Sequence, residues 1–199
     1  MLKFFLKDWP QLHTAATAVT VPALCKKIQQ REIYFPLLIT LITMDQQQLK
    51  AILNYHNDDV ISRFTDQFKI SEAEAEDIFT ETKKFLYLCQ LPGIFIPDEL
   101  LIVDEMWHNF ILFTKEYQQF CDRHFGRYFH HLPASKAEKE NHKVEEAANP
   151  DRIREAFNQK LSIVISQAYD HLGPDTVIKW FNDYPVKYSK PIISSLRKY

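Results

Sequence analysis

Apolar residues recur along this chain at intervals of three and four, the period of an amphipathic α-helix. Alternation with a period of two, which marks half-buried strands, is scarce. In the clearest helical segment, Glu76, Lys83 and Lys84 are expected on the outer face. The apolar stripe of that segment consists of Ala75, Ile78, Phe79, Thr82, Phe85, Leu86 and Cys89. The pattern therefore predicts an all-α protein built as a multi-helix globular domain.

Capping residues divide the pattern into separate helices. Asp45 is a predicted N-cap, Asp58 or Asp59 is expected to open a further helix, and Ser71 and Glu74 have the spacing of a capping box. The predicted helices cover residues 21–30, 34–44, 46–55, 58–68, 72–89, 98–123, 150–171 and 175–182. After residue 182 we expect an irregular end rich in Tyr, Pro and Lys.

The helix over residues 98–123 is the longest before residue 150. Pro97 suits its first turn, and Gly126 is the glycine that can end it. On one continuous helix, residues 108 and 121 would lie about 20 Å apart. A single ion could then bind both only if the helix breaks between them.

Three regions follow from these signals. We expect a helical domain over residues 1–133, a charged linker or exposed helix over 134–149, and a C-terminal helical segment over 150–199. That last segment is expected to pack on the main domain, because an exposed apolar stripe is unfavourable. The stripe consists of Ile153, Phe157, Leu161, Val164, Ile165 and Ala168.

Composition narrows the functional classes. The chain has 199 residues, 46% of them hydrophobic, and a formal net charge of −2. A near-neutral chain provides no basic field for phosphate, so nucleic acid is not expected as a partner. No apolar run has the length of a membrane span and no export signal stands out, so we expect a cytoplasmic protein that binds no membrane. Glycine-rich phosphate loops and the common hydrolase motifs are absent.

Candidate chemistry gathers in residues 104–133, which hold four of the eight histidines. Asp104 and His108 are four residues apart, so on one helix their side chains share a face and can pair. A carboxylate beside an imidazole selects its tautomer, for general-base catalysis or for metal binding. Asp104 and His108 are therefore the candidate catalytic residues.

Two candidate metal sets use the same region. Cys121 and His124 are three residues apart, and a turn at Gly126 can bring back His130 or His131, which gives sulfur and nitrogen ligands suited to zinc. The second set combines Asp104 and His108 with His130 or His131. Either set would hold zinc or another divalent metal, and a hydrogen-bonded cluster without metal is the alternative to both.

Three local motifs in this region carry a family resemblance. They are D-E-M-W-H at 104–108, I-L-F-T-x-x-Y-x-x-F-C at 111–121 and F-G-x-Y-x-H-H-x-P at 125–133. Together they resemble stand-alone bacterial members of the glycine-rich domain-containing protein-like family, and the resemblance extends from about residue 68. It implies a helical domain without an assigned reaction. The chain has three glycines, so the glycine-rich tail of the plant relatives is missing, and RNA binding is not carried over.

The leading functional prediction is a protein-interaction or adaptor module with a protein partner. Its candidate binding residues are Trp107, Tyr117, His130 and His131, within an aromatic-rich region. The alternative is a metal-dependent or histidine-based hydrolase or transferase that uses Asp104, His108, His130 and His131. The sequence leaves the substrate, the partner and the oligomeric state open.

Overall fold

The computed structural model describes residues 44–198, and within that range the protein is all-α, as predicted. The extended pairing there is one isolated antiparallel bridge between Phe68 and Arg197. None of the helices formed by these residues is long and apolar enough to cross a membrane. The helices predicted for residues 21–30 and 34–43 lie outside the described residues.

The chain divides into two compact units. The larger unit comprises Tyr34–Phe129 and Ile163–Tyr199, and the smaller one comprises Met1–Ile33 and His130–Ser162. The first part of the larger unit contains α2 (Gln46–Leu53), α3 (Asp58–Gln67), α4 (Glu72–Leu88), the short 3₁₀ helix η1 (Asp98–Leu100), α5 (Leu101–Ile111) and α6 (Thr114–Phe125).

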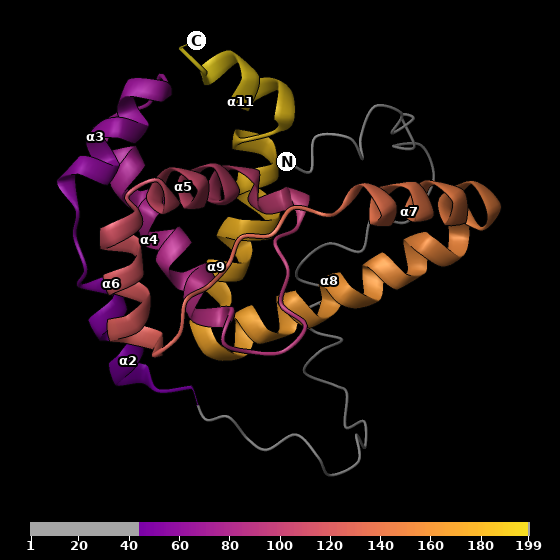
Figure 1. Cartoon of the computed structure of the whole chain (residues 1–199), viewed down its shortest axis with the longest axis horizontal. Helices are drawn as coiled ribbons and strands as arrows, with labels where there is room; N and C mark the ends of the chain where they lie inside the picture. Colours follow the sequence, from indigo (N-terminus) through magenta and orange to yellow (C-terminus); the bar gives the residue numbers. More distant parts are fainter. Residues whose placement is uncertain (1–43, 199) are drawn as a thin grey trace. The chain divides into compact units, whose positions relative to one another are not determined.

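Helix α4 is the centre of the larger unit, since it packs against α2, α3 and α5. Its N-cap is Ser71, as predicted, whose side chain accepts a hydrogen bond from the backbone N–H of Glu74. The Glu74 carboxylate accepts a hydrogen bond from the hydroxyl of Tyr188. In Figure 1, α6 lies beside α2, which matches the contacts between these two helices.

An aromatic cluster fills the space between α4, α5 and α6. The Phe110 ring lies at its centre, 5.1 Å from the ring of Phe79, 5.3 Å from that of Phe120 and 5.8 Å from that of Tyr55. Edge-to-face rings at such distances add to the stability that burial provides. The cluster fixes the relative positions of the three helices that surround the candidate site.

The helix predicted over residues 98–123 is wrong in one respect: the chain breaks at residues 112–113 into α5 and α6. The break allows Trp107 and Tyr117 to meet, with 2.9 Å between the indole Nε1 and the phenol oxygen. On one straight helix, ten residues would separate them by about 15 Å. Tertiary packing therefore outweighs the continuous helical pattern.

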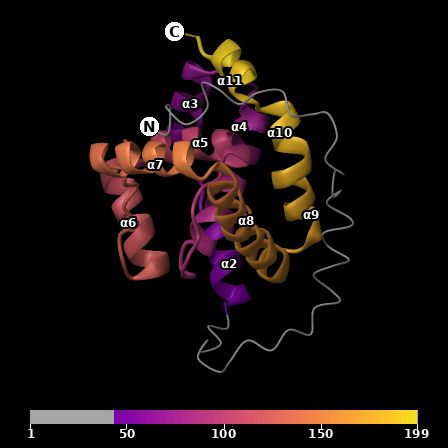
Figure 2. The ribbon, with the colours of Figure 1, turned by 90° about the vertical axis from the view of Figure 1, so that its right-hand side faces the viewer.

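The chain after residue 173 forms α9 (Pro174–Ile178), a π-helical turn η2 (Lys179–Asp183), α10 (Tyr184–Lys187) and α11 (Lys190–Leu196). The expectation of an irregular end is therefore wrong. Pro185 and Pro191 stand in the first turns of α10 and α11, where proline fits because its missing N–H has no helical partner. Figure 2 shows α9, α10 and α11 following one another along the chain.

The described part of the smaller unit contains α7 (Lys136–Ala148) and the first part of α8 (Pro150–Leu172). A complete capping box at Ser135 and Glu138 begins α7, and none of its residues is buried. Of the predicted apolar stripe on α8, Val164, Ile165 and Ala168 are buried. Phe157 is exposed, while Ile153 and Leu161 are half-buried.

Candidate functional site

Asp104 and His108 lie one turn apart on α5, as their spacing predicts. Nδ1 of His108 is 3.5 Å from Oδ2 of Asp104. The Asp104 side chain is 14% exposed and the His108 side chain 40%, so the pair lies at the edge of the buried face. The buried face of α5 consists of Ile102, Val103, Met106, Trp107, Asn109 and Phe110. The helix thus holds both groups firmly while leaving them open to a small ligand.

A chain of two hydrogen bonds joins α5, α6 and the segment after α6. The Trp107 indole donates to the Tyr117 hydroxyl over 2.9 Å, and that hydroxyl donates to the backbone carbonyl of Phe129 over 2.8 Å. Trp107 is 7% exposed and Tyr117 is fully buried. Burial is also the main cause that raises the pKa of Tyr117. These two hydrogen bonds hold the chain in place at Phe129, and the predicted role of Trp107 and Tyr117 in binding a partner stays a prediction.

Gly126 turns the chain at the end of α6. Its φ of +64° lies in the left-handed region that glycine adopts readily. His131 follows Phe129 by two residues along the chain and is half-buried. Because Asp104 and His108 belong to the larger unit and His131 to the smaller one, the prediction that a histidine after Gly126 comes near His108 stays a prediction.

Among the described residues of the larger unit, Cys121 and His124 form no ligand cluster with Asp104 and His108. Cys121 is buried, and burial raises the pKa of its thiol. The His124 ring lies 4.9 Å from the ring of Phe120, and burial, followed by the charge of Arg123, lowers its pKa. His130 is exposed. Although the helix break removes the geometric objection to joining His108 and Cys121, the structure does not bring them together with the other ligands.

Further negative charge lies near Asp104. Burial has the largest effect on the pKa of Asp98 and raises it. Lys190 lowers this pKa, and the charge of Asp104 raises it. Lys190 Nζ lies 4.0 Å from an Asp98 oxygen.

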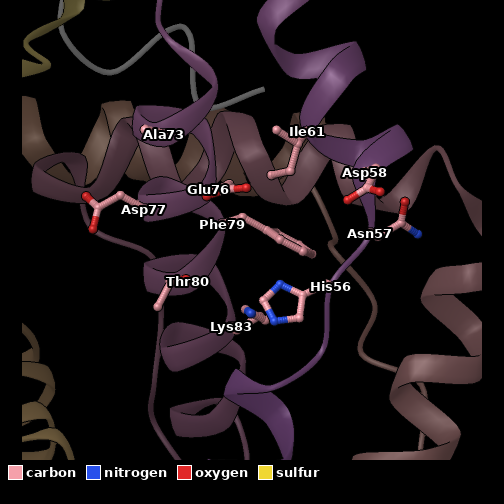
Figure 3. Close-up of a pocket in the computed structure, with 10 residues that line it drawn as sticks. All are labelled: His56, Asn57, Asp58, Ile61, Ala73, Glu76, Asp77, Phe79, Thr80 and Lys83. Atoms are coloured by element: carbon pink, nitrogen blue, oxygen red, sulfur yellow. The ribbon is translucent and has the colours of Figure 1, made fainter.

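The sequence reasoning missed a second group around Lys83. This side chain is 2% exposed, although we expected it on the outer face of α4. Its ammonium donates hydrogen bonds to the carbonyls of Leu53 and Tyr55, at 2.8 and 2.7 Å, so it satisfies backbone acceptors at the end of α2. Figure 3 shows Lys83 among the residues that line a cavity beside α4. A sequence signal existed, since Lys83 follows Phe79 of the apolar stripe by four residues.

Comparison with known proteins gives one match. A family model described as UCP032817-like matches residues 47–168, which include the candidate ligands and the motifs at 104–133. No curated protein and no solved structure matches the chain. The match supports a family whose name assigns no activity, and it does not support the finer assignment to the glycine-rich domain-containing protein-like family.

Proposed function

The chain belongs to the UCP032817-like family, and we propose that Asp104 and His108, with His131 as the third candidate ligand that the sequence offers, bind one divalent transition-metal ion. The observation that carries this proposal is the pairing of a carboxylate and an imidazole on α5, where Asp104 Oδ2 lies 3.5 Å from His108 Nδ1. Imidazole nitrogens with one carboxylate oxygen are a ligand set for zinc and for other first-row metals. Zinc is the first ion to test.

The spacing of the pair supports joint ligation. Two ligands of a tetrahedral zinc ion at 2.0–2.1 Å lie about 3.3 Å apart. Asp104 Oδ2 and His108 Nδ1 are separated by 3.5 Å, which is longer than an ordinary hydrogen bond.

The reaction that we propose is metal-dependent hydrolysis. Catalytic zinc sites keep one position open for water. Asp104 and His108 are only partly buried, which would leave room for a substrate. Zinc lowers the pKa of bound water to about 7 and thereby supplies a nucleophile. Asp104, His108 and His131 would hold the ion, while the Trp107–Tyr117 hydrogen bonds would keep the chain before His131 in position.

The role as an interaction module and the existence of a protein partner remain predictions. These predictions rest on the aromatic residues Trp107 and Tyr117, which are buried. A partner would contact their side chains only after a rearrangement of this region. The resemblance to the glycine-rich domain-containing protein-like family likewise remains a proposal about ancestry. For these reasons we place the metal centre first.

Zinc binding by the full chain tests the proposal. Isothermal calorimetry with zinc should give one ion per chain for the wild type, and metal analysis of the purified protein should detect a bound metal. We expect His108→Gln, His131→Gln and Asp104→Asn each to weaken binding by at least about tenfold. His130→Gln is the matched control, because His130 is adjacent to the half-buried His131 but is itself exposed.

Two outcomes would overturn parts of this proposal separately. If the wild type binds no zinc, cobalt or nickel at micromolar concentration, or if His130→Gln weakens binding as much as His131→Gln, the metal centre is wrong. The zinc-loaded wild type should hydrolyse p-nitrophenyl acetate or bis-p-nitrophenyl phosphate at least about tenfold faster than His108→Gln. Metal binding without any such difference would reject the hydrolase and keep the metal centre.

A further inference from the structure

A cavity of about 230 Å³ lies beside α4 in the larger unit. One side is formed by the start of α3 and the residues before it, and the other by α4, as Figure 3 shows. The lining is mainly polar and contains one buried amine, Lys83. The lining residues named for their chemistry are His56, Asp58, Glu76, Asp77, Phe79 and Lys83.

The Lys83 amine is held by the backbone rather than by a carboxylate. Its nitrogen donates to the carbonyl oxygens of Leu53 and Tyr55, and it lies 5.1 Å from the centre of the Phe79 ring. A neutral amine has two N–H donors, so these two carbonyls satisfy both of them. The lone pair then occupies the remaining tetrahedral position of the nitrogen.

Burial also increases the fraction of Lys83 that is neutral near physiological pH. It lowers the pKa of Lys83 to about 8, although the charge of Glu76 acts in the opposite direction. At pH 7.5 an amine with that pKa is neutral in about one molecule in four, against about one in a thousand for an ordinary lysine. Buried lysines of this kind serve as nucleophiles toward carbonyl compounds.

We propose that Lys83 is a reactive amine that condenses with a small aldehyde or ketone bound in this cavity. The nitrogen lone pair forms a bond to the carbonyl carbon, and the carbonyl electron pair moves to oxygen, which takes up a proton. The nitrogen then loses both of its protons, the oxygen takes up a second one and departs as water, and an imine remains. One amine and one carbonyl compound thus give one imine and one water without any change of oxidation state.

The charges around the cavity select the carbonyl compound. Asp58 and Glu76 contribute carboxylates, and the carboxylate of Asp77 is paired with Lys179 at 2.6 Å. Anionic compounds such as 2-oxo acids would be repelled by these carboxylates. We therefore expect neutral or cationic aldehydes and ketones to react in preference to anionic ones.

Reductive labelling of the wild-type chain tests the proposal without any change to Lys83. The folded protein is treated at pH 7.5 with glycolaldehyde, which is neutral, and cyanoborohydride, which reduces the imine to a stable secondary amine. Peptide mass spectrometry then gives the labelling rate at each lysine. We expect Lys83 to react at least about tenfold faster than the exposed Lys50. Glyoxylate, which is anionic, should label Lys83 more slowly than glycolaldehyde does.

A cavity-filling variant distinguishes a site from a merely nucleophilic amine. Ala73 is exposed and lines the cavity, so Ala73→Leu should fold and should slow the labelling of Lys83 while leaving Lys50 unchanged. The proposal is overturned if Lys83 reacts no faster than Lys50 in the folded wild type and reaches the rate of Lys50 only in urea. Lys83 would then be solely a structural cap of α2. Equal rates with glyoxylate and glycolaldehyde would overturn the predicted charge preference.

Discussion

Lys83 shows how burial couples the charge of a single residue to the stability of the folded chain. Its folded pKa of about 8 lies below the ordinary lysine value, mainly because burial disfavours the ammonium. Between about pH 8 and pH 10, the unfolded chain therefore binds more protons at this residue than the folded chain does. The contribution of Lys83 to stability must then rise with pH across this window.

We predict that the unfolding free energy of the wild type, minus that of Lys83→Met, rises by about 2 kcal/mol from pH 8 to pH 10. Burial raises the thiol pKa of Cys89 and of Cys121, which makes the stability of both proteins fall in the same pH window. The difference between wild type and variant removes this shared effect. Urea unfolding of both proteins at the two pH values gives the result. A difference that stays constant or falls would contradict the lowered pKa of Lys83.

At the scale of elements, the end of α6 depends on the backbone conformation of Gly126. Its φ is +64°, and a Cβ built there would meet no atom within 4 Å. Gly126→Ala should therefore cost about 1 kcal/mol through backbone strain alone, without a clash. Gly126→Asn should cost less, because asparagine tolerates the left-handed region better than alanine does.

Urea unfolding of the two Gly126 variants measures this ordering. The wild type should be the most stable, followed by the asparagine variant and then the alanine variant. An alanine variant as stable as the wild type would mean that α6 can end in another way. The turn would then be determined by packing around Phe129 rather than by the glycine.

At the scale of the whole larger unit, a buried carboxylate joins helices that are far apart in the sequence. Glu81 of α4 is 2% exposed, and it accepts hydrogen bonds from the Trp180 indole at 2.8 Å and from Lys179 at 2.9 Å. Lys84 also donates to it, at 3.0 Å. Removing the charge of Glu81 would leave these donors in a poorly solvated place.

Glu81→Gln should therefore destabilise the protein by about 3 kcal/mol. Asp77→Asn is the matched control, because Asp77 also binds Lys179 but its side chain is 48% exposed, and it should cost less than about 1 kcal/mol. Chemical unfolding of the two variants compares them. Similar costs would show that the Glu81 network contributes no more than an ordinary surface ion pair.

The sequence by itself determined what depends on neighbours along the chain. The apolar period predicted an all-α fold, the capping residues placed most helix starts within a few residues, and four-residue spacing placed Asp104 beside His108. Helix α3 begins at Asp58, as predicted, with Asn57 as its N-cap. These features were predictable because hydrogen bonds and side-chain directions within a helix repeat over three or four residues.

Tertiary structure alone decided where distant segments meet. It broke the helix at residues 112–113 so that Trp107 and Tyr117 could bond, and it buried Lys83 under the end of α2. The packing of several helices around a common core sets these distances. No local pattern encodes them, because each depends on side chains contributed by several elements at once.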